Sequence, residues 1–169
     1  MNKRIIPLLV ITSALLLTGC GKKNADGGSG QAGDTSTSQT DGYKTVEITG
    51  STMGGKMNNP GAYSKEIDGL KISVSNGLID ENYNTKNVEI RIYKDATLTL
   101  EATEVTKAIF TCTANGTDKQ GPGNFTADVG NYTYEESGPK GTWEGSAAKI
   151  VFTAATNQVR CLTISVTYK

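Results

Sequence analysis

Apolar and polar residues alternate along much of the chain beyond residue 45. Val88, Ile90 and Ile92 would share one face of an extended strand. Glu89 and Arg91 would lie on the other face. This period of two predicts antiparallel strands with one buried and one solvated face. Segments rich in β-branched and aromatic residues predict seven strands, at 45–49, 70–75, 88–93, 96–101, 107–113, 148–153 and 159–168.

Turn-forming residues separate these segments. Asn76-Gly77 and Asn115-Gly116 suit tight turns with positive φ, and Lys94-Asp95 is short enough for a hairpin. A single twisted sheet of seven strands would leave one face bare, so we expect an all-β, antiparallel, jelly-roll-like sandwich. Leu162 interrupts the alternation of the last strand, which indicates either a bulge there or a strand buried on both faces.

The first 20 residues have the three parts of a secretory signal. Lys3 and Arg4 precede an apolar run over 5–17, and Thr18-Gly19-Cys20 ends it. A transmembrane anchor is the alternative, although the apolar run is short for crossing a bilayer. We therefore predict a signal peptide at 1–19, a spacer at 20–44 and one domain at 45–169. The spacer is polar and glycine-rich, so we expect it to be disordered.

Leu17-Thr18-Gly19-Cys20 resembles the lipobox of bacterial lipoproteins. The resemblance implies that Cys20 receives diacylglycerol and becomes the mature amino terminus, so that membrane lipid is a partner of the chain. Several acyl chains on one residue anchor stably. The expected location is therefore a cell membrane or the outer envelope surface, on the extracytoplasmic side.

A longer pattern covers residues 89–100, 105–110, 150–153 and 158–168, with Trp143 between them. This pattern resembles a β-sandwich module of surface lipoproteins from gut-type bacteria. The resemblance implies a jelly-roll fold similar to that of carbohydrate-binding modules. Cys161 stands where that module favours an aliphatic residue.

Composition narrows the function classes. The formal net charge is zero, which argues against a nucleic-acid binder, since such proteins need a concentrated basic face. The chain contains no histidine, so mechanisms that use a histidine base or metal ligand are excluded within one chain. We expect a protein that is not an enzyme.

Tyr132, Tyr134 and Trp143 are the candidate ligand-binding residues. Aromatic rings beside polar groups can stack on the apolar face of a sugar, and Tyr132 and Tyr134 would share one side of a strand. The alternative is that Trp143 and one tyrosine fill the end of the core.

Cys112 and Cys161 lie on two predicted strands. They form either a disulfide, which an exported chain can keep, or a pair of buried thiols. Asp80 and Glu81 are weak candidates for calcium ligands, although their spacing fits no EF-hand. No other cofactor is expected.

These observations favour a lipid-anchored, non-catalytic binding module, with a glycan as the first candidate partner. The alternative is a structural or adhesive lipoprotein that contacts an envelope protein. A hydrolase accessory domain is a further alternative.

Overall fold

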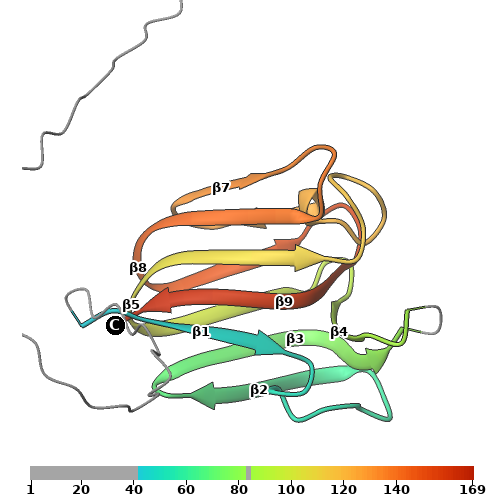
Figure 1. Ribbon diagram of the computed structural model, residues 1–169, viewed down its shortest axis with the longest axis horizontal. Helices are drawn as coiled ribbons and strands as arrows, with labels where there is room; N and C mark the ends of the chain where they lie inside the picture. Colours follow the sequence, from blue (N-terminus) through green and yellow to red (C-terminus); the bar gives the residue numbers. More distant parts are fainter. Residues whose placement is uncertain (1–41, 83–84) are drawn as a thin grey trace, which may run out of the picture. The chain divides into compact units, whose positions relative to one another are not determined.

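The computed structural model describes residues 42–82 and 85–169, which form one all-β domain (Figure 1). The predicted signal peptide, Cys20 and most of the predicted spacer lie outside the described residues. The elements are, in chain order, β1 (Lys44–Thr49), β2 (Gly61–Ile67), β3 (Leu70–Glu81), β4 (Val88–Ile92), β5 (Thr97–Cys112), the 3-10 helix η1 (Pro122–Asn124), β6 (Phe125–Ala127), β7 (Asn131–Tyr134), β8 (Lys140–Ala154) and β9 (Val159–Tyr168).

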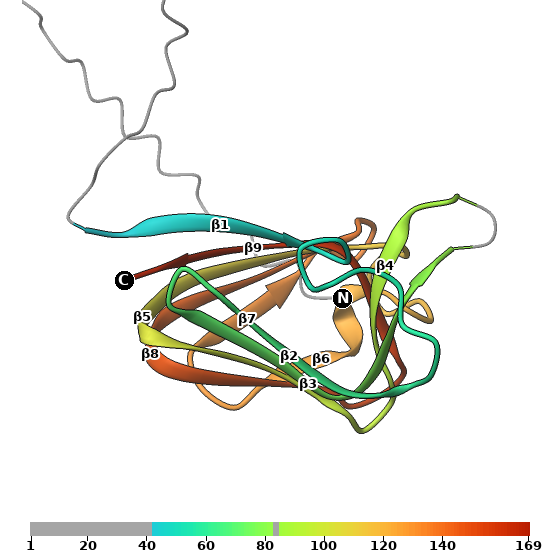
Figure 2. The same cartoon turned by 90° about the horizontal axis from the view of Figure 1, so that it is seen from below.

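The strands form one antiparallel sheet that folds back on itself. Its order is β1-β9-β4-β3-β5-β8-β6, with β2 beside β3 and β7 beside β8. Strand β9 also pairs with β5, so strands distant in this order meet again around the core. In Figure 2, β1 and β9 run along one side of the interior and β2 and β3 along the opposite side. The predicted antiparallel, sandwich-like fold is confirmed, and the sheet avoids a bare face by folding over.

Two predicted strands, 96–101 and 107–113, are one strand of 16 residues, β5. Register shifts between Glu101 and Lys107 bend this strand. Its first part pairs with β3 and its last part with β9. The residues of β2 and β7 are mostly exposed, so these strands lack the apolar alternation that would have predicted them.

Two turn predictions are wrong. Asn76-Gly77 lies inside β3, where a Cβ on Gly77 would sit 2.1 Å from the carbonyl oxygen of Arg91. Glycine is needed there for close approach of two strands. Lys94-Asp95 joins β4 to β5, but these strands do not pair with each other, so the turn is no hairpin. At Asn115-Gly116 the prediction of positive φ is confirmed, since Gly116 has a φ of 45°.

Alternate residues of the strands fill the core. Phe110 lies at the centre of an aromatic group, and its ring centroid is 4.8 Å from that of Phe152 and 5.3 Å from that of Phe125. Edge-to-face pairs of this kind add to the energy of apolar burial.

The irregularity at Leu162 is a bulge. Thr163 lies opposite Thr111 and Cys161 opposite Cys112, so Leu162 has no partner on β5. The extra residue shifts the alternation of side chains by one position. Cys161 before the bulge and Ile164 after it therefore both point into the core, and both are fully buried.

Candidate binding cleft

The three aromatic residues singled out by the sequence do not form one exposed platform. Trp143 is 0% exposed, and its Nε1–H donates to the carbonyl oxygen of Val129 at 2.6 Å. Tyr132 lies opposite Trp143 in the register of β7 and β8, and its hydroxyl donates to the carbonyl oxygen of Pro122 at 2.9 Å. Tyr134 alone is well exposed, at 40%. This agrees with the alternative in which Trp143 and one tyrosine belong to the core.

The two calcium candidates are engaged in ion pairs. Asp80 lies 3.3 Å from both Lys56 and Arg91, and Glu81 lies 3.5 Å from Lys86. Within residues 42–82 and 85–169, no cluster of three or more acidic or cysteine side chains could hold a metal ion.

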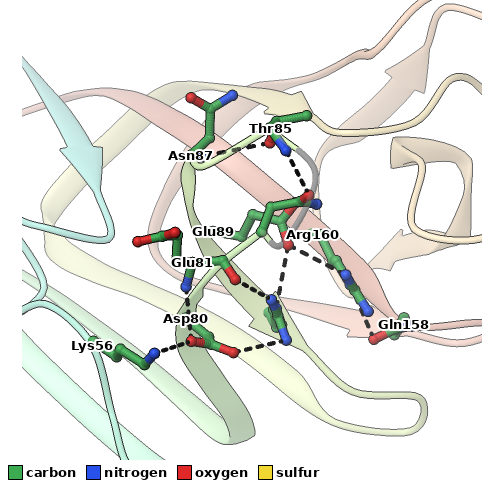
Figure 3. A network of polar contacts seen from close by, with 10 residues as sticks. Lys56, Asp80, Glu81, Thr85, Asn87, Glu89, Gln158 and Arg160 are labelled. Carbon is green, nitrogen blue, oxygen red and sulfur yellow. Dashed lines mark hydrogen bonds and ion pairs between the residues drawn. The ribbon is translucent and has the colours of Figure 1, made fainter.

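Asp80 belongs to a network of charged side chains centred on Glu89 (Figure 3). Glu89 is fully buried. Its Oε2 accepts from Arg91 Nε at 3.2 Å and from Arg160 Nη1 at 3.3 Å. Its Oε1 accepts from Asn82 Nδ2 at 2.6 Å. Two arginines and an amide thus satisfy a carboxylate that would otherwise be costly to bury.

The strand register explains why these charges are compatible. Asp80 lies opposite Glu89, and Arg91 lies opposite Arg160, so like charges face each other directly. Such pairs are destabilising in isolation. Here Arg91 contacts both carboxylates and Arg160 contacts Glu89. Opposite charges therefore meet along the diagonals, in Arg91–Asp80 and Arg160–Glu89, and along β4, in Arg91–Glu89.

The pKa of Asp80 reflects this setting. Partial burial acts to raise the pKa, but hydrogen bonds from Lys56 and from the backbone N–H of Glu81, together with the charge of Arg91, lower it below its usual value. The carboxylate is therefore held in its ionised form.

An open cleft of about 530 Å³ lies where three loops meet strand β3. It lies beside the charged network, because the network reaches Gln158, one of the residues that line the cleft (Figure 3). The lining comes from four separate segments and consists of Asn76, Tyr93, Lys94, Lys119, Asn157 and Gln158. This set combines one aromatic ring, three amides and two ammonium groups.

A buried amide fixes the loops around the cleft. Asn124, 1% exposed, donates from Nδ2 to the carbonyl oxygens of Asp118 and Gly121 at 2.8 and 3.0 Å. Its Oδ1 accepts from Asn157 Nδ2 at 3.4 Å. The segment that carries Lys119 and the segment that carries Asn157 are thus held by one side chain.

Both lysine-bearing turns have unusual backbone geometry. Asp95, which follows Lys94, has a φ of 65°, and Gln120, which follows Lys119, has a φ of 88°. Non-glycine residues rarely adopt such angles. Residues that do adopt them are most frequent at sites where the structure holds particular groups in place. Lys94 and Lys119 are exposed, and neither forms an ion pair with any residue of the described ranges.

A second hollow, of about 320 Å³, is lined by Thr117, Tyr134, Glu136 and Ser137. Thr117 and Lys119 belong to the same loop, so one loop contributes to both the cleft and this hollow. The hollow contains the exposed ring of Tyr134 beside hydroxyl groups and a carboxylate.

Cys112 and Cys161 are both buried, with free thiols. They lie opposite each other in the register of β5 and β9. Cys20 lies outside the described residues.

Sequence reasoning missed the residues that line the cleft. From the sequence, Asn76 and Lys94 are only parts of predicted turns, Tyr93 ends a predicted strand, and Gln158 begins the last segment of the module-like pattern. No periodicity or spacing links positions 76, 94, 119 and 158, because folding alone brings them together. The one local signal is that Lys94, Lys119, Asn157 and Gln158 lie in polar segments between strands, where binding residues often occur.

In the part of the chain that the structure describes, no helix is long and apolar enough to span a membrane. No protein-family model matches the chain, and the comparisons with curated proteins and with solved structures found no match either.

Proposed function

We propose that this protein is an extracytoplasmic lipoprotein, held to a membrane through Cys20, whose β domain binds a glycan in the loop cleft. The observation that carries the proposal is the lining of the cleft, in which Tyr93, three amides and two lysines border an open hollow of about 530 Å³.

The lining suits a carbohydrate because it offers both kinds of contact that a sugar needs. The ring of Tyr93 can stack on the apolar face of a pyranose. The amides of Asn76, Asn157 and Gln158 can both donate to and accept from hydroxyl groups. A small number of fixed polar groups around an apolar surface is typical of sites that orient a small ligand.

The two lysines favour sugars that carry acid groups. None of the six lining residues is acidic, although Asp95 and Asp118 are the chain neighbours of Lys94 and Lys119. A uronate or phosphate would form charge-assisted hydrogen bonds with the ammonium groups. The hollow at Tyr134 lies on the same loop and could hold a further sugar unit of a longer chain.

The proposed role is binding without catalysis. The lining residues include no carboxylate pair of the kind that cleaves glycosidic bonds, and no cysteine. The chain has no histidine to act as a base.

The proposal is tested with the full chain carrying Cys20→Ser, which stays free of lipid. Immobilised neutral and uronate-containing polysaccharides are offered to this protein, and retention is measured. We expect retention of an acidic glycan that weakens about tenfold in the double variant Lys94→Ala/Lys119→Ala, equivalent to about 1.4 kcal/mol. Retention should also fall with added salt, because charge pairs at a surface are screened.

The matched control is Lys65→Ala/Lys149→Ala. These lysines are also exposed and line neither the cleft nor the hollow at Tyr134, so the net charge changes equally while the cleft stays intact. The proposal fails if no glycan is retained, or if both double variants weaken retention to the same extent.

A further inference from the structure

The buried cysteines of β5 and β9 occupy a register position suited to a covalent cross-link. In the register of these strands, Cys112 lies opposite Cys161. The bulge at Leu162 creates this arrangement, because without the extra residue Cys161 would point away from the core that Ile164 enters.

The backbone hydrogen bonds identify the type of pair. The N–H of Thr113 donates to the carbonyl oxygen of Arg160 at 3.0 Å, while the N–H of Cys112 donates to Pro139, away from β9. Bonds between the flanking residues mark Cys112 and Cys161 as a non-hydrogen-bonded antiparallel pair. In such pairs the Cα atoms are about 4.5 Å apart and the side chains are at their closest. A disulfide requires Cα atoms within roughly 4.4–6.8 Å.

The side chains also point toward each other. The two thiols are hydrogen-bonded. This hydrogen bond is the main cause, and burial the second, of a pKa for the Cys161 thiol well above its usual value. Cys112 is 2% exposed and Cys161 is 0% exposed. Inside the folded domain the Cys161 thiol is therefore held in its protonated form, and both sulfur atoms are shielded from solution.

We propose that Cys112 and Cys161 form a cross-strand disulfide when the chain folds in an oxidising compartment. The oxidant is a disulfide-containing thiol carrier, such as oxidised glutathione or a protein disulfide. The thiolate of one cysteine attacks the carrier disulfide, forms a mixed disulfide and releases one carrier thiol. The thiolate of the second cysteine then attacks the first cysteine's sulfur, which closes the Cys112–Cys161 bond and releases the second carrier thiol. The protein loses two electrons and two protons, and the carrier is reduced to two thiols.

The burial of the pair determines when the reaction can occur. Only a thiolate attacks a disulfide, and access limits the rate. We expect oxidation during folding, before β5 and β9 close over the sulfur atoms. The finished bond should resist reductant in the folded protein for the same reason.

The test uses the full chain with Cys20→Ser, so that only this pair can react. The chain is unfolded, reduced and refolded with oxidised glutathione, then unfolded again and treated with a maleimide without reductant. We expect no maleimide addition, a mass lower by two hydrogen atoms, and addition to both cysteines once reductant is included. Free thiols after refolding, or glutathione adducts as the main product, would overturn the proposal.

A second measurement compares the thermal unfolding of the refolded protein before and after reduction under unfolding conditions. The bond closes a loop of roughly 50 residues, so reduction should lower Tm by on the order of 10 °C. In Cys112→Ala and Cys161→Ala the response of Tm to reductant should vanish, whatever each substitution does to Tm itself. These outcomes do not depend on the cleft binding a ligand, so failure of the disulfide and failure of the glycan proposal are distinguishable.

Discussion

Arg160 donates a hydrogen bond from Nη1 to the buried carboxylate of Glu89, 3.3 Å away. Arg160 Nε also lies 3.4 Å from Oε1 of Gln158, at the rim of the cleft. One arginine thus connects a fully buried charge with a residue that the proposed ligand would touch.

Glu89→Ala should destabilise the domain by about 2–4 kcal/mol, because Arg91 and Arg160 lose the carboxylate that compensates them in a partly buried setting. The control is Glu144→Ala, which breaks an exposed pair with Lys107 and should cost less than about 1 kcal/mol. Urea unfolding measures both. Equal costs for the two variants would contradict the assigned importance of the Glu89 network.

The lowered pKa of Asp80 predicts a specific loss of stability in acid. A carboxyl group whose pKa is lower in the folded state stabilises the fold above its unfolded-state pKa, ordinarily 3.8, and loses that contribution as the pH falls through the folded value. Wild type should therefore be more stable than Asp80→Asn near neutrality, and the difference should narrow below pH 3.8. Urea midpoints across this range provide the measurement. A difference that is the same at every pH would show that the charge of Asp80 does not contribute.

Gly77→Ala should destabilise the domain by about 2–4 kcal/mol, since the new methyl group would collide with the backbone of β4 at Arg91. Gly61 lies opposite Gly77 in the register of β2 and β3, and a Cβ there would meet nothing within 4 Å. Gly61→Ala should therefore change the stability by no more than about 0.5 kcal/mol. Chemical denaturation of both variants provides the measurement. A loss of stability in Gly77→Ala alone indicates close backbone approach, whereas an equal loss in both indicates a general intolerance of alanine in these strands.

Trp143 is the only tryptophan, so its fluorescence reports on its surroundings alone. We expect a blue-shifted emission that acrylamide quenches weakly, and no quenching by a glycan that is retained. Trp143→Phe should cost about 2 kcal/mol, because it removes core volume and leaves the carbonyl oxygen of Val129 without its donor. Tyr134→Ala removes an exposed ring and should leave stability almost unchanged. Strong quenching of the tryptophan by a bound glycan would contradict this assignment.

The lipid anchor is tested at the amino terminus of the mature protein. Mass spectrometry should find a chain that begins at Cys20 and carries acyl groups, and Cys20→Ser should move the protein from the membrane fraction to the soluble fraction. An unmodified chain beginning elsewhere would refute the anchor. This result has no bearing on the cleft or on the cysteine pair.

The sequence by itself determined the fold class, because a period of two in apolar residues can bury only one face of an extended strand. It also located the irregularity at Leu162, where that period breaks, but only the register of β5 and β9 showed that a bulge, and not burial on both faces, is the cause. It did not predict β2 or β7, because their residues are mostly exposed and follow no apolar pattern, nor β6, which has only three residues. It also divided β5 in two, since the register shifts after Glu101 interrupt the alternation without ending the strand.

Tertiary structure decided which side chains meet. Trp143 is buried because β7 places Tyr132 opposite it and the chain near Val129 accepts its N–H, and both contacts depend on strand pairing. The cleft likewise joins four segments that share no local signal. Residue types and their periodicity are properties of the chain, whereas register and loop positions follow from long-range contacts that form only when the sheet closes. For this reason the sequence predicted a β domain with two core cysteines, and only the fold placed those cysteines opposite each other.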